Sequence, residues 1–567
     1  MKQKHLLYFL VLLLCMLCTS MWQHSALAGA GSPPEIVLKP GEKQALIAGG
    51  VVQLPVAPVI EKEITLVPLR FIAECLKTEV KWDESTKKIA IIAPGKEIQL
   101  EVGKNEAMVN GAPQLLVSPP VIIEDFCLAP LRFISEFLGA KVAYLPQTKE
   151  IHITLPPPPN QPPAARFKFA KTPVDQGETV EYLDASSDPD GDKIINWQWT
   201  GKKRAFFKPG EYTVSLRVQD GHKVWSEPIE ATITVTDKVL MDEITYNFTN
   251  PIPGEPLDIA HIPVTSLRVI DPVITMGSEK VLLSNSPETF TEDGILYTDT
   301  VMGSARIHYH HQNGTTVNKY VYLLATNKGS KPAEIIITKQ GTGGPSDAMS
   351  VGRMAVYRFL ASGSSTPVAI LPEETRILYA TRPVFPGQCI DGLFDVKTNN
   401  DVLFSVVVTE NLDPVTQYEQ LKLLPLDGNH SRGTFPASNR FISVNLDQPE
   451  TSRLIIADGK NDFFLSGMDE RTKRIANNTG NYGVLYELTI ESKYKTGIVL
   501  SARGGPFVGA IKWDNQVFYL PNSGILNSPD KGALIGVLLP GQQKTLYFIP
   551  PSGSCLPINL VFIPFGA

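Results

Sequence analysis

The most regular pattern along the chain is the alternation of apolar and polar side chains over short stretches. In residues 212–218 and again in residues 229–235, every second side chain is apolar. This period of two is typical of strands with one buried face. More continuous apolar runs at 402–408 and 534–539 fit the core of a sandwich. We therefore predict a multidomain chain built mainly of β-strands.

One segment of the chain occurs twice. Residues 66–76, LVPLRFIAECL, return as residues 128–138, LAPLRFISEFL. In each copy a proline, Pro68 or Pro130, stands where a helix would begin, which suits its fixed φ and missing N–H. Apolar residues follow at spacings of three and seven, so each copy predicts a short helix with one apolar face. Strand patterns come after both helices, and together the copies predict an α+β domain.

This doubled pattern resembles the copper amine oxidase N-terminal-like domain, also called the stalk domain, over residues 36–153. The resemblance implies an α+β module on the surface of Gram-positive bacteria. It does not imply amine oxidation, because a quinone-forming oxidase needs a Thr-x-x-Asn-Tyr-Asp/Glu segment. The chain offers only Thr479-Gly-Asn-Tyr482-Gly, in which the spacing differs and the acid is missing. We therefore expect neither amine oxidase activity nor a bound quinone.

The first 28 residues have the pattern of a secretory signal peptide. Basic residues precede an apolar stretch at 6–17, and Ser25-Ala-Leu-Ala28 supplies the small residues of a cleavage site. The alternative is an uncleaved anchor, since residues 6–22 approach membrane-spanning length. We expect cleavage before Gly29 and export, with no transmembrane segment in the mature protein.

A proline-rich linker, residues 154–163, is expected to hold the first domain apart from the next one. Residues 164–237 contain Ala185-Ser-Ser-Asp-Pro-Asp-Gly-Asp192 and Trp197-Gln-Trp199. With these segments they resemble a polycystic-kidney-disease-type (PKD) domain. The resemblance implies an Ig-like β-sandwich that serves as a spacer or binding module in surface proteins.

A group of aspartates in this part of the chain is a candidate calcium site. Carboxylate oxygens are the hard ligands that Ca²⁺ prefers. The alternative is an Asp/Gly turn between strands, held by hydrogen bonds from side chain to backbone. The candidate ligands are Asp184, Asp188, Asp190 and Asp192.

Short segments of the remaining chain recur in the same order. Pro287-Glu-Thr289 returns as Pro449-Glu-Thr451, and Gly387-Gln-Cys389 returns as Gly553-Ser-Cys555. Between them, Tyr322-Leu-Leu324 returns as Tyr486-Glu-Leu488, and Leu378-Tyr379 returns as Leu546-Tyr547. Four matches in register predict two tandem β-sandwich-like domains, which we place at 240–412 and 413–567.

The segment Arg306-Ile-His308-Tyr-His310-His311 is the strongest chemical candidate in this half. On a strand, His308 and His310 point to one face, as a metal-binding pair requires. His430 is distant in sequence and no third ligand follows, so a polar strand face is the alternative. No nucleophile elbow, Walker-type loop or H-E-x-x-H motif occurs. The carboxylate pair of a glycoside hydrolase has no fixed spacing in sequence, and the search for one requires a structure.

The composition is that of a folded protein that does not bind nucleic acid. A length of 567 residues suggests three or four domains, and 43% apolar residues supply their cores. The net charge of -6 does not provide the basic surface that phosphates require. Four cysteines beyond the signal segment are too few for a disulfide scaffold: Cys75, Cys127, Cys389 and Cys555.

We therefore expect an exported, non-enzymatic protein that is secreted or held at the cell wall or surface of a Gram-positive bacterium. Its expected partner is an envelope polymer, a surface protein or a glycan, and no cofactor is expected other than Ca²⁺ at the aspartates. The alternative is a secreted polysaccharide-acting enzyme with its catalytic site in residues 240–567. A cleft with paired carboxylates there would support the enzyme, whereas flat sandwiches with exposed aromatic residues would support binding.

Overall fold

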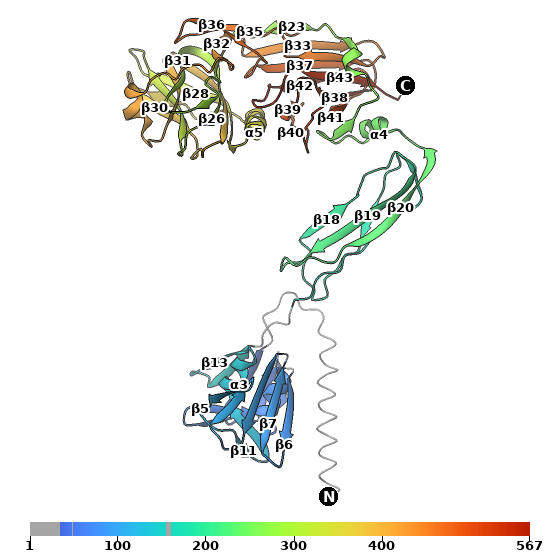
Figure 1. Ribbon diagram of the computed structural model, residues 1–567, viewed down its shortest axis with the longest axis vertical. Helices are drawn as coiled ribbons and strands as arrows, with labels where there is room; N and C mark the ends of the chain where they lie inside the picture. Colours follow the sequence, from blue (N-terminus) through green and yellow to red (C-terminus); the bar gives the residue numbers. More distant parts are fainter. Residues whose placement is uncertain (1–34, 48, 77, 94, 155–159, 567) are drawn as a thin grey trace. The chain divides into compact units, whose positions relative to one another are not determined.

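The computed structural model describes five stretches of the chain, residues 35–47, 49–76, 78–93, 95–154 and 160–566. The expected signal peptide, its cleavage site and half of the proline-rich linker, residues 155–159, lie outside these residues. The chain divides into two compact units (Figure 1). The first holds the described residues up to 236 except 175–178 and 206–208, and the second holds these two short stretches and residues 237–566.

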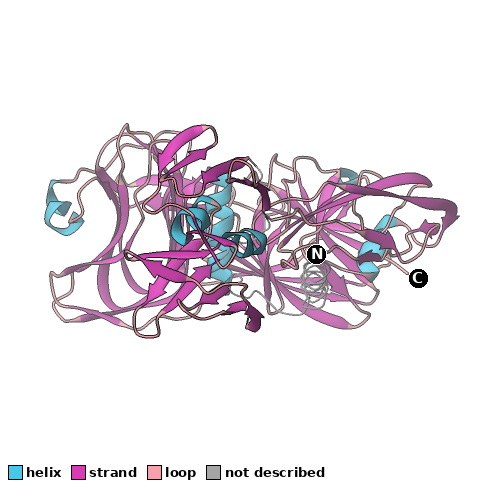
Figure 2. Cartoon of the chain, turned by 90° about the horizontal axis from the view of Figure 1, so that it is seen from below, coloured by secondary structure: helices cyan, strands magenta, loops and turns pink. Residues whose placement is uncertain are grey.

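Strands dominate both units, as the alternating patterns predict (Figure 2). Helices are few and short, and the longest described one is α5 (Ala348–Ala361). Within the described stretches, no helix combines the length and the apolar character needed to cross a membrane. The mainly β, multidomain architecture expected from the sequence is confirmed.

The two copies of the repeated segment form matching helices in the first domain. Helix α2 (Leu69–Cys75) begins directly after Pro68, and helix α3 (Leu131–Phe137) begins directly after Pro130. Each helix contributes a fully buried isoleucine to one shared core, together with strands from both copies. The predicted position and apolar face of both helices are therefore correct.

The strands that lead into these helices pair with each other. In this antiparallel pair Leu66 lies opposite Pro130, and Pro68 lies opposite Leu128. Leu66 is equivalent to Leu128, and Pro68 is equivalent to Pro130. The two pairs are therefore related by a local twofold axis at this strand pair.

Three antiparallel sheets complete the first domain. The first contains β13 (Lys141–Leu145), β14 (Glu150–Thr154), β1 (Glu35–Leu38), β2 (Gln44–Ile47) and β3 (Gly50–Gln53) in this order. The second contains β10 (Ala112–Leu115), β9 (Glu106–Val109), β8 (Lys96–Glu101), β7 (Lys88–Ala93) and β6 (Glu79–Asp83). The third contains β11 (Val121–Ile123), β12 (Phe126–Pro130), β5 (Ile64–Pro68) and β4 (Val59–Glu61).

The next part of the chain is a small β-fold with two sheets. Its apolar alternation is buried as predicted, because Val214, Leu216 and Val218 are fully enclosed while their neighbours are not. One sheet pairs β15 (Phe167–Phe169) with β17 (Tyr182–Asp184). The other has the order β16 (Val174–Gln176), β20 (Ile229–Val239), β19 (Gly210–Gln219) and β18 (Asn196–Thr200). Membership of the PKD family stays a prediction.

Two six-stranded sheets of the second unit share one core and form a β-sandwich, here called the C-terminal sandwich. The first contains β21 (Pro256–Asp258), β41 (Lys531–Leu538), β38 (Thr496–Ala502), β43 (Ile558–Pro564), β34 (Ser452–Ile456) and β22 (Arg268–Val269). The second contains β23 (Val273–Met276), β33 (Asn439–Leu446), β37 (Leu485–Ser492), β42 (Gln542–Phe548), β39 (Gly509–Trp513) and β40 (Gln516–Leu520).

A third sheet, here called the large sheet, has eleven strands and a separate core. Its main path runs through β29 (Val368–Ile370), β28 (Ala333–Ser346), β31 (Cys389–Thr409), β26 (Gly294–Asn313), β24 (Lys280–Ser284), β32 (Arg432–Pro436), β35 (Leu465–Asp469) and β36 (Arg474–Asn478). The branches are β25 (Thr289–Phe290), β27 (Tyr320–Asn327) and β30 (Thr375–Ala380). The second unit also contains the short helices α4 (Glu243–Thr249) and α6 (Pro414–Gln417).

The tandem domains expected at 240–412 and 413–567 share strands in all three sheets. Strand β24 of the first range pairs with β32 of the second, and β23 pairs with β33. Likewise β21 pairs with β41 and β22 with β34. The chain therefore leaves the C-terminal sandwich, builds most of the large sheet and then returns to the sandwich. Each of the three sheets contains strands from both ranges, so residue 412 is not a boundary between two separate sandwiches.

The recurring segments nevertheless occupy equivalent places. In the large sheet, β27 pairs with β30 so that Tyr322 lies opposite Ala380. In the C-terminal sandwich, β37 pairs with β42 so that Tyr486 lies opposite Phe548. The paired strands carry the second and third matching segments in the same antiparallel arrangement.

Helix α5 contacts both parts of the second unit, since it packs against β28 and β31 of the large sheet and against β39 of the C-terminal sandwich. Glycines permit this close approach. A Cβ atom at Gly343 would lie 1.9 Å from the carbonyl oxygen of Val351 on the helix, and one at Gly352 would lie 2.1 Å from the carbonyl oxygen of Ser552. The loop that carries Ser552 is thereby held against the helix.

Candidate functional site

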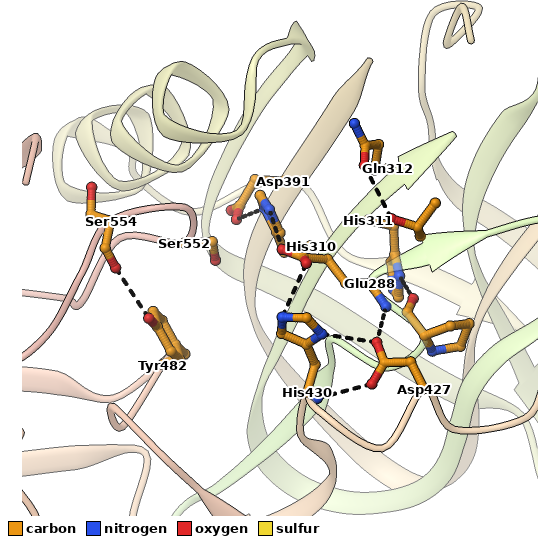
Figure 3. Close-up of polar contacts among 12 residues, drawn as sticks. Glu288, His310, His311, Gln312, Asp391, Asp427, His430, Tyr482, Ser552 and Ser554 are labelled. Atoms are coloured by element: carbon orange, nitrogen blue, oxygen red, sulfur yellow. Dashed lines mark hydrogen bonds and ion pairs between the residues drawn. The ribbon is translucent and has the colours of Figure 1, made fainter. Parts of the chain in front are cut away.

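Two histidines of β26, His308 and His310, contact a buried carboxylate of β31, that of Asp391. Figure 3 shows His310 beside Asp391. His308 and His310 are two residues apart on the strand and so share a face, as predicted. Asp391 lies directly opposite His310 in the strand register. Its Oδ2 atom is 3.3 Å from Nε2 of His308 and 3.1 Å from Nδ1 of His310. The two imidazoles therefore share one carboxylate oxygen.

His308, His310 and Asp391 form one end of a group of polar side chains, here called the histidine cluster. This end is closed to solvent, because each of the three residues is 1% exposed. Burial by itself raises the pKa of Asp391, but His308 and His310 lower it more, and the net pKa lies well below its usual range. Asp391 is therefore an anion enclosed in the protein, and the neighbouring imidazoles stabilise it.

Ser552 reaches the same cluster from the C-terminal sandwich. Its Oγ lies 3.1 Å from Nε2 of His308, and its side chain is buried. In a Ser-His-Asp triad the serine and the carboxylate contact opposite nitrogens of the imidazole. Here both contact Nε2 of His308, so the three residues do not have the geometry of a hydrolytic triad.

The cluster continues outward through Glu288 and His430. One carboxylate oxygen of Glu288 lies 3.6 Å from Nε2 of His310, and the other lies 3.0 Å from Nε2 of His430. Nδ1 of His430 lies 2.9 Å from Oδ2 of Asp427. Glu288 and His430 are 32% and 37% exposed at their side chains, so this end of the cluster opens to solvent.

Asp427 orders the loop around His430. Burial raises the pKa of Asp427, but hydrogen bonds from the backbone N–H groups of Glu288, His430 and Asn429 lower it more, and the net pKa is far below the usual range. The ionised carboxylate also accepts a hydrogen bond from the hydroxyl of Ser286. Two loops remote in sequence are thus joined at this side chain.

His311 takes no part in the cluster. Its Nε2 contacts the hydroxyl of Ser284, and its Nδ1 contacts the backbone oxygen of Pro287. Complete burial lowers the pKa of His311 to about 3. Both nitrogens are occupied, and neither is available to a ligand.

The first unit holds an acidic cluster made of Asp188, Asp192 and Asp220, whose ligand atoms all lie within 4.8 Å of one another. In the described part of the chain it is the only group of three or more such ligand atoms packed this closely. One carboxylate oxygen of Asp188 is buried without a hydrogen-bond partner. The side-chain oxygen of Asn160 is likewise without a partner, whereas the amide N–H of Asn160 donates to Asp220.

The structure separates the four aspartates that the sequence predicts as candidate calcium ligands. Asp188 and Asp192 belong to the acidic cluster, whereas Asp184 accepts a hydrogen bond from the indole of Trp197. Asp190 accepts hydrogen bonds from Gln161. The turn bonds of the alternative interpretation are also present, because Asp188 accepts from the backbone N–H groups of Asp190 and Asp192.

The sequence reasoning missed Asp220 because it lies 28 residues beyond Asp192, outside the aspartate-rich segment. It missed Glu288, Asp391 and Asp427 because single acids in strands and loops carry no signal in sequence. Calcium at the aspartates and a metal at the histidine pair both stay predictions.

The comparisons with known proteins bear on one part of the chain. Residues 34–153 match the copper amine oxidase N-terminal domain family. The recognition of this domain from its doubled motif is therefore confirmed. No curated protein sequence matches the chain.

Similar solved structures have low scores. One concerns carbohydrate-binding modules of the β-sandwich superfamily; it is 16% identical with a TM-score of 0.14, over 45% of this chain and 100% of that one. Tripeptidyl peptidase 2 is 8% identical with a TM-score of 0.11, over 71% of this chain and 34% of that one. A Paenibacillus xanthan lyase is 9% identical with a TM-score of 0.12, over 95% of this chain and 50% of that one. Scores this low do not indicate a shared fold.

Each copy within the copper amine oxidase N-terminal domain carries a half-exposed aromatic residue at the equivalent position. Trp82 on β6 is 40% exposed and Tyr144 on β13 is 44% exposed. Both strands lie at the edge of their sheets. A surface cavity of about 230 Å³ adjoins Trp82 and is also lined by Lys88 and Gln99.

Proposed function

We propose that the protein is an exported, non-enzymatic component of a Gram-positive cell envelope. Residues 36–153 contribute to retention at the wall or surface, and residues 240–567 form a binding or assembly surface. The observation that carries the proposal is the family match of residues 34–153, since the doubled motif there resembles the stalk domain of surface proteins.

The buried end of the histidine cluster supports a role without catalysis. His308, His310 and Asp391 contact one another and are sealed from solvent. A substrate needs access to its acid, base or nucleophile, usually in a concave pocket. The contacts of Ser552 also differ from those of an activated nucleophile.

The aromatic pair of the first domain suggests how an envelope polymer would be held. Partly exposed aromatic residues are favoured in interfaces because a rigid ring buries much area at low entropic cost. Trp82 and Tyr144 present such rings at equivalent positions in the two copies. A polymer with repeating units, such as a wall glycan, would engage both rings, and the second contact would then form at high effective concentration.

Cell fractionation tests retention. The full-length protein, a deletion of residues 36–153 and a Trp82→Ala/Tyr144→Ala variant are compared for partitioning between wall and medium. We expect the deletion and the double variant to move into the medium, and the retained protein to be released by strong denaturant. Trp197→Ala, which removes an exposed aromatic residue of the next module, is the matched control.

Two outcomes would contradict the proposal. Unchanged partitioning of the deletion would show that residues 36–153 do not retain the protein. Release of soluble sugar from purified wall material by the full-length protein would favour the alternative, a secreted polysaccharide-acting enzyme with its site in residues 240–567.

A further inference from the structure

Glu288 lies between two imidazoles that come from distant parts of the chain. His310 is on β26, Glu288 precedes β25, and His430 is in the loop before β32 (Figure 3). The Nε2 atom of His310 is 3.6 Å from one oxygen of Glu288, and the Nε2 atom of His430 is 3.0 Å from the other. The same nitrogen of each ring therefore faces one carboxylate.

Both rings are held from behind by a second carboxylate. Nδ1 of His310 contacts Asp391 at 3.1 Å, and Nδ1 of His430 contacts Asp427 at 2.9 Å. Metal-bound histidines usually donate their other ring N–H to a carboxylate, which sets the tautomer and orients the ring. With a proton on Nδ1, the lone pair of each Nε2 points toward Glu288.

The contact between His310 and Glu288 is unfavourable without a positive charge. Nε2 of His310 is buried and has no hydrogen-bond partner, because 3.6 Å is too long for a hydrogen bond to Glu288. A buried polar atom without a partner costs free energy, and here its lone pair faces an anion. A cation between the two groups removes both problems.

We propose that Glu288, His310 and His430 are the protein ligands of a divalent transition-metal ion such as Zn²⁺. Two imidazoles and one carboxylate form a ligand set that Zn²⁺ and related ions use, with the remaining position left to water. The partly exposed side of Glu288 and His430 provides the entry path and the room for that water.

The contacts of Glu288 fit such an ion. In a tetrahedral zinc site with bonds near 2.0–2.1 Å, neighbouring ligand atoms are about 3.3 Å apart. The contact of His310 with one oxygen of Glu288, at 3.6 Å, and that of His430 with the other oxygen, at 3.0 Å, lie on either side of this value. In the described structure the three residues do not yet bring one ligand atom each within 4.8 Å of the other two. A movement of the loop that carries both His430 and Asp427 toward His310 would close the site and keep the contact between these two side chains.

The inference changes the role of the histidine pair. His308 does not join His310 on the ion, because its Nε2 faces Asp391 and Ser552. The further ligands come from a loop residue and from a histidine 120 positions beyond His310. The site is independent of export and wall retention, so its test and the fractionation experiment fail or succeed separately.

Metal titration of the full-length protein tests the proposal. The protein is stripped with a chelator and titrated with Co²⁺, whose visible absorption reports its ligands, and Zn²⁺ affinity is measured by competition with a chromophoric chelator. We expect one tightly bound equivalent. Glu288→Gln and His430→Ala should each lower the Zn²⁺ affinity at least tenfold, and Asp427→Asn should lower it about tenfold through the orientation of His430.

Matched variants show whether the loss of any acidic or histidine side chain outside the site also lowers the Zn²⁺ affinity. Glu450→Gln alters the glutamate of the second Pro-Glu-Thr segment, and His261→Ala alters an exposed histidine of the same unit. Asp188→Asn alters the acidic cluster of the first unit. All three should bind Zn²⁺ as the unaltered protein does. Glu288 and His430 are partly exposed, so their variants should fold, and far-UV circular dichroism checks this.

Either of two results would overturn the proposal. The first is a stripped protein that takes up neither Co²⁺ nor Zn²⁺. The second is a pair of Glu288→Gln and His430→Ala variants that have unchanged circular dichroism and bind both ions as tightly as the unaltered protein. The cluster would then be a network of ion pairs and hydrogen bonds alone.

Discussion

The carboxylate of Asp391 lies 3.1 Å from Nδ1 of His310, and both side chains are 1% exposed. A group whose pKa is lowered by folding adds stability above its unfolded pKa and loses it as the pH falls toward the folded value. The unfolded pKa of an aspartate is about 3.9. The folded pKa of Asp391 is lower, because His308 and His310 outweigh the effect of burial.

We therefore expect Asp391→Asn to lower the free energy of unfolding at pH 7 by about 3 kcal/mol, since it leaves buried imidazoles without their anion. Below pH 4 the difference from the unaltered protein should shrink. Urea unfolding between pH 2 and pH 7 measures both effects. Asp401→Asn changes an exposed aspartate of the same strand and should have little effect at either pH. A constant difference across this range would contradict the assignment.

Calcium at the acidic cluster is tested by thermal unfolding of the first unit within the full chain. We expect Ca²⁺ at ten times its dissociation constant to stabilise this transition by about 1.4 kcal/mol, because only the folded cluster binds the ion. Asp188→Asn should abolish the shift. Asp184→Asn should retain it, since Asp184 contacts Trp197 and lies outside the cluster. Equal shifts in both variants would show that Ca²⁺ acts elsewhere.

The purified protein should oxidise no primary amines and contain no quinone. Tyr482, the only tyrosine in a segment that approaches the oxidase motif, donates its hydroxyl to the backbone oxygen of Ser554. Burial raises the pKa of Tyr482 to about 12. Peroxide release from amines in the presence of Cu²⁺, together with a redox-cycling stain for quinones, measures the activity. Peroxide above the level of a Tyr482→Phe control would refute this expectation.

Cys389 and Cys555 should not be bonded to each other. They occupy matching positions of the recurring segments, and both are free thiols in the described structure. Burial raises the pKa of Cys389 to about 11, so at neutral pH this thiol should react with iodoacetamide far more slowly in the native protein than after denaturation. Peptide mapping without reductant is the direct measurement, and a peptide that joins the two cysteines would disprove the claim.

Local features of the fold follow from neighbouring residues and were predictable. Pro68 and Pro130 mark the starts of two helices because the fixed φ and missing N–H of proline suit the N-terminal end of a helix. The alternation in residues 212–218 identifies a strand and its buried face because successive side chains of a strand point in opposite directions. Such signals depend on geometry within a few residues.

The candidate sites depend on groups that the sequence holds far apart. The histidine segment by itself predicts no third metal ligand beside His308 and His310, because His430 is distant in sequence. In the folded chain Glu288 contacts both His310 and His430, because β24 pairs with β26 and with β32. The same pairing joins the ranges 240–412 and 413–567, which the recurring segments had separated.

The sequence by itself determined the mainly β architecture, the doubled first domain and its family, because each depends on periodicity or on a motif read in order along the chain. Only the tertiary structure decided which strands share a sheet and which acids and imidazoles meet. Those contacts require hydrogen-bonded strands that come from separate parts of the chain. Their register is set by burial of whole faces, a property of the assembled core and of no single segment.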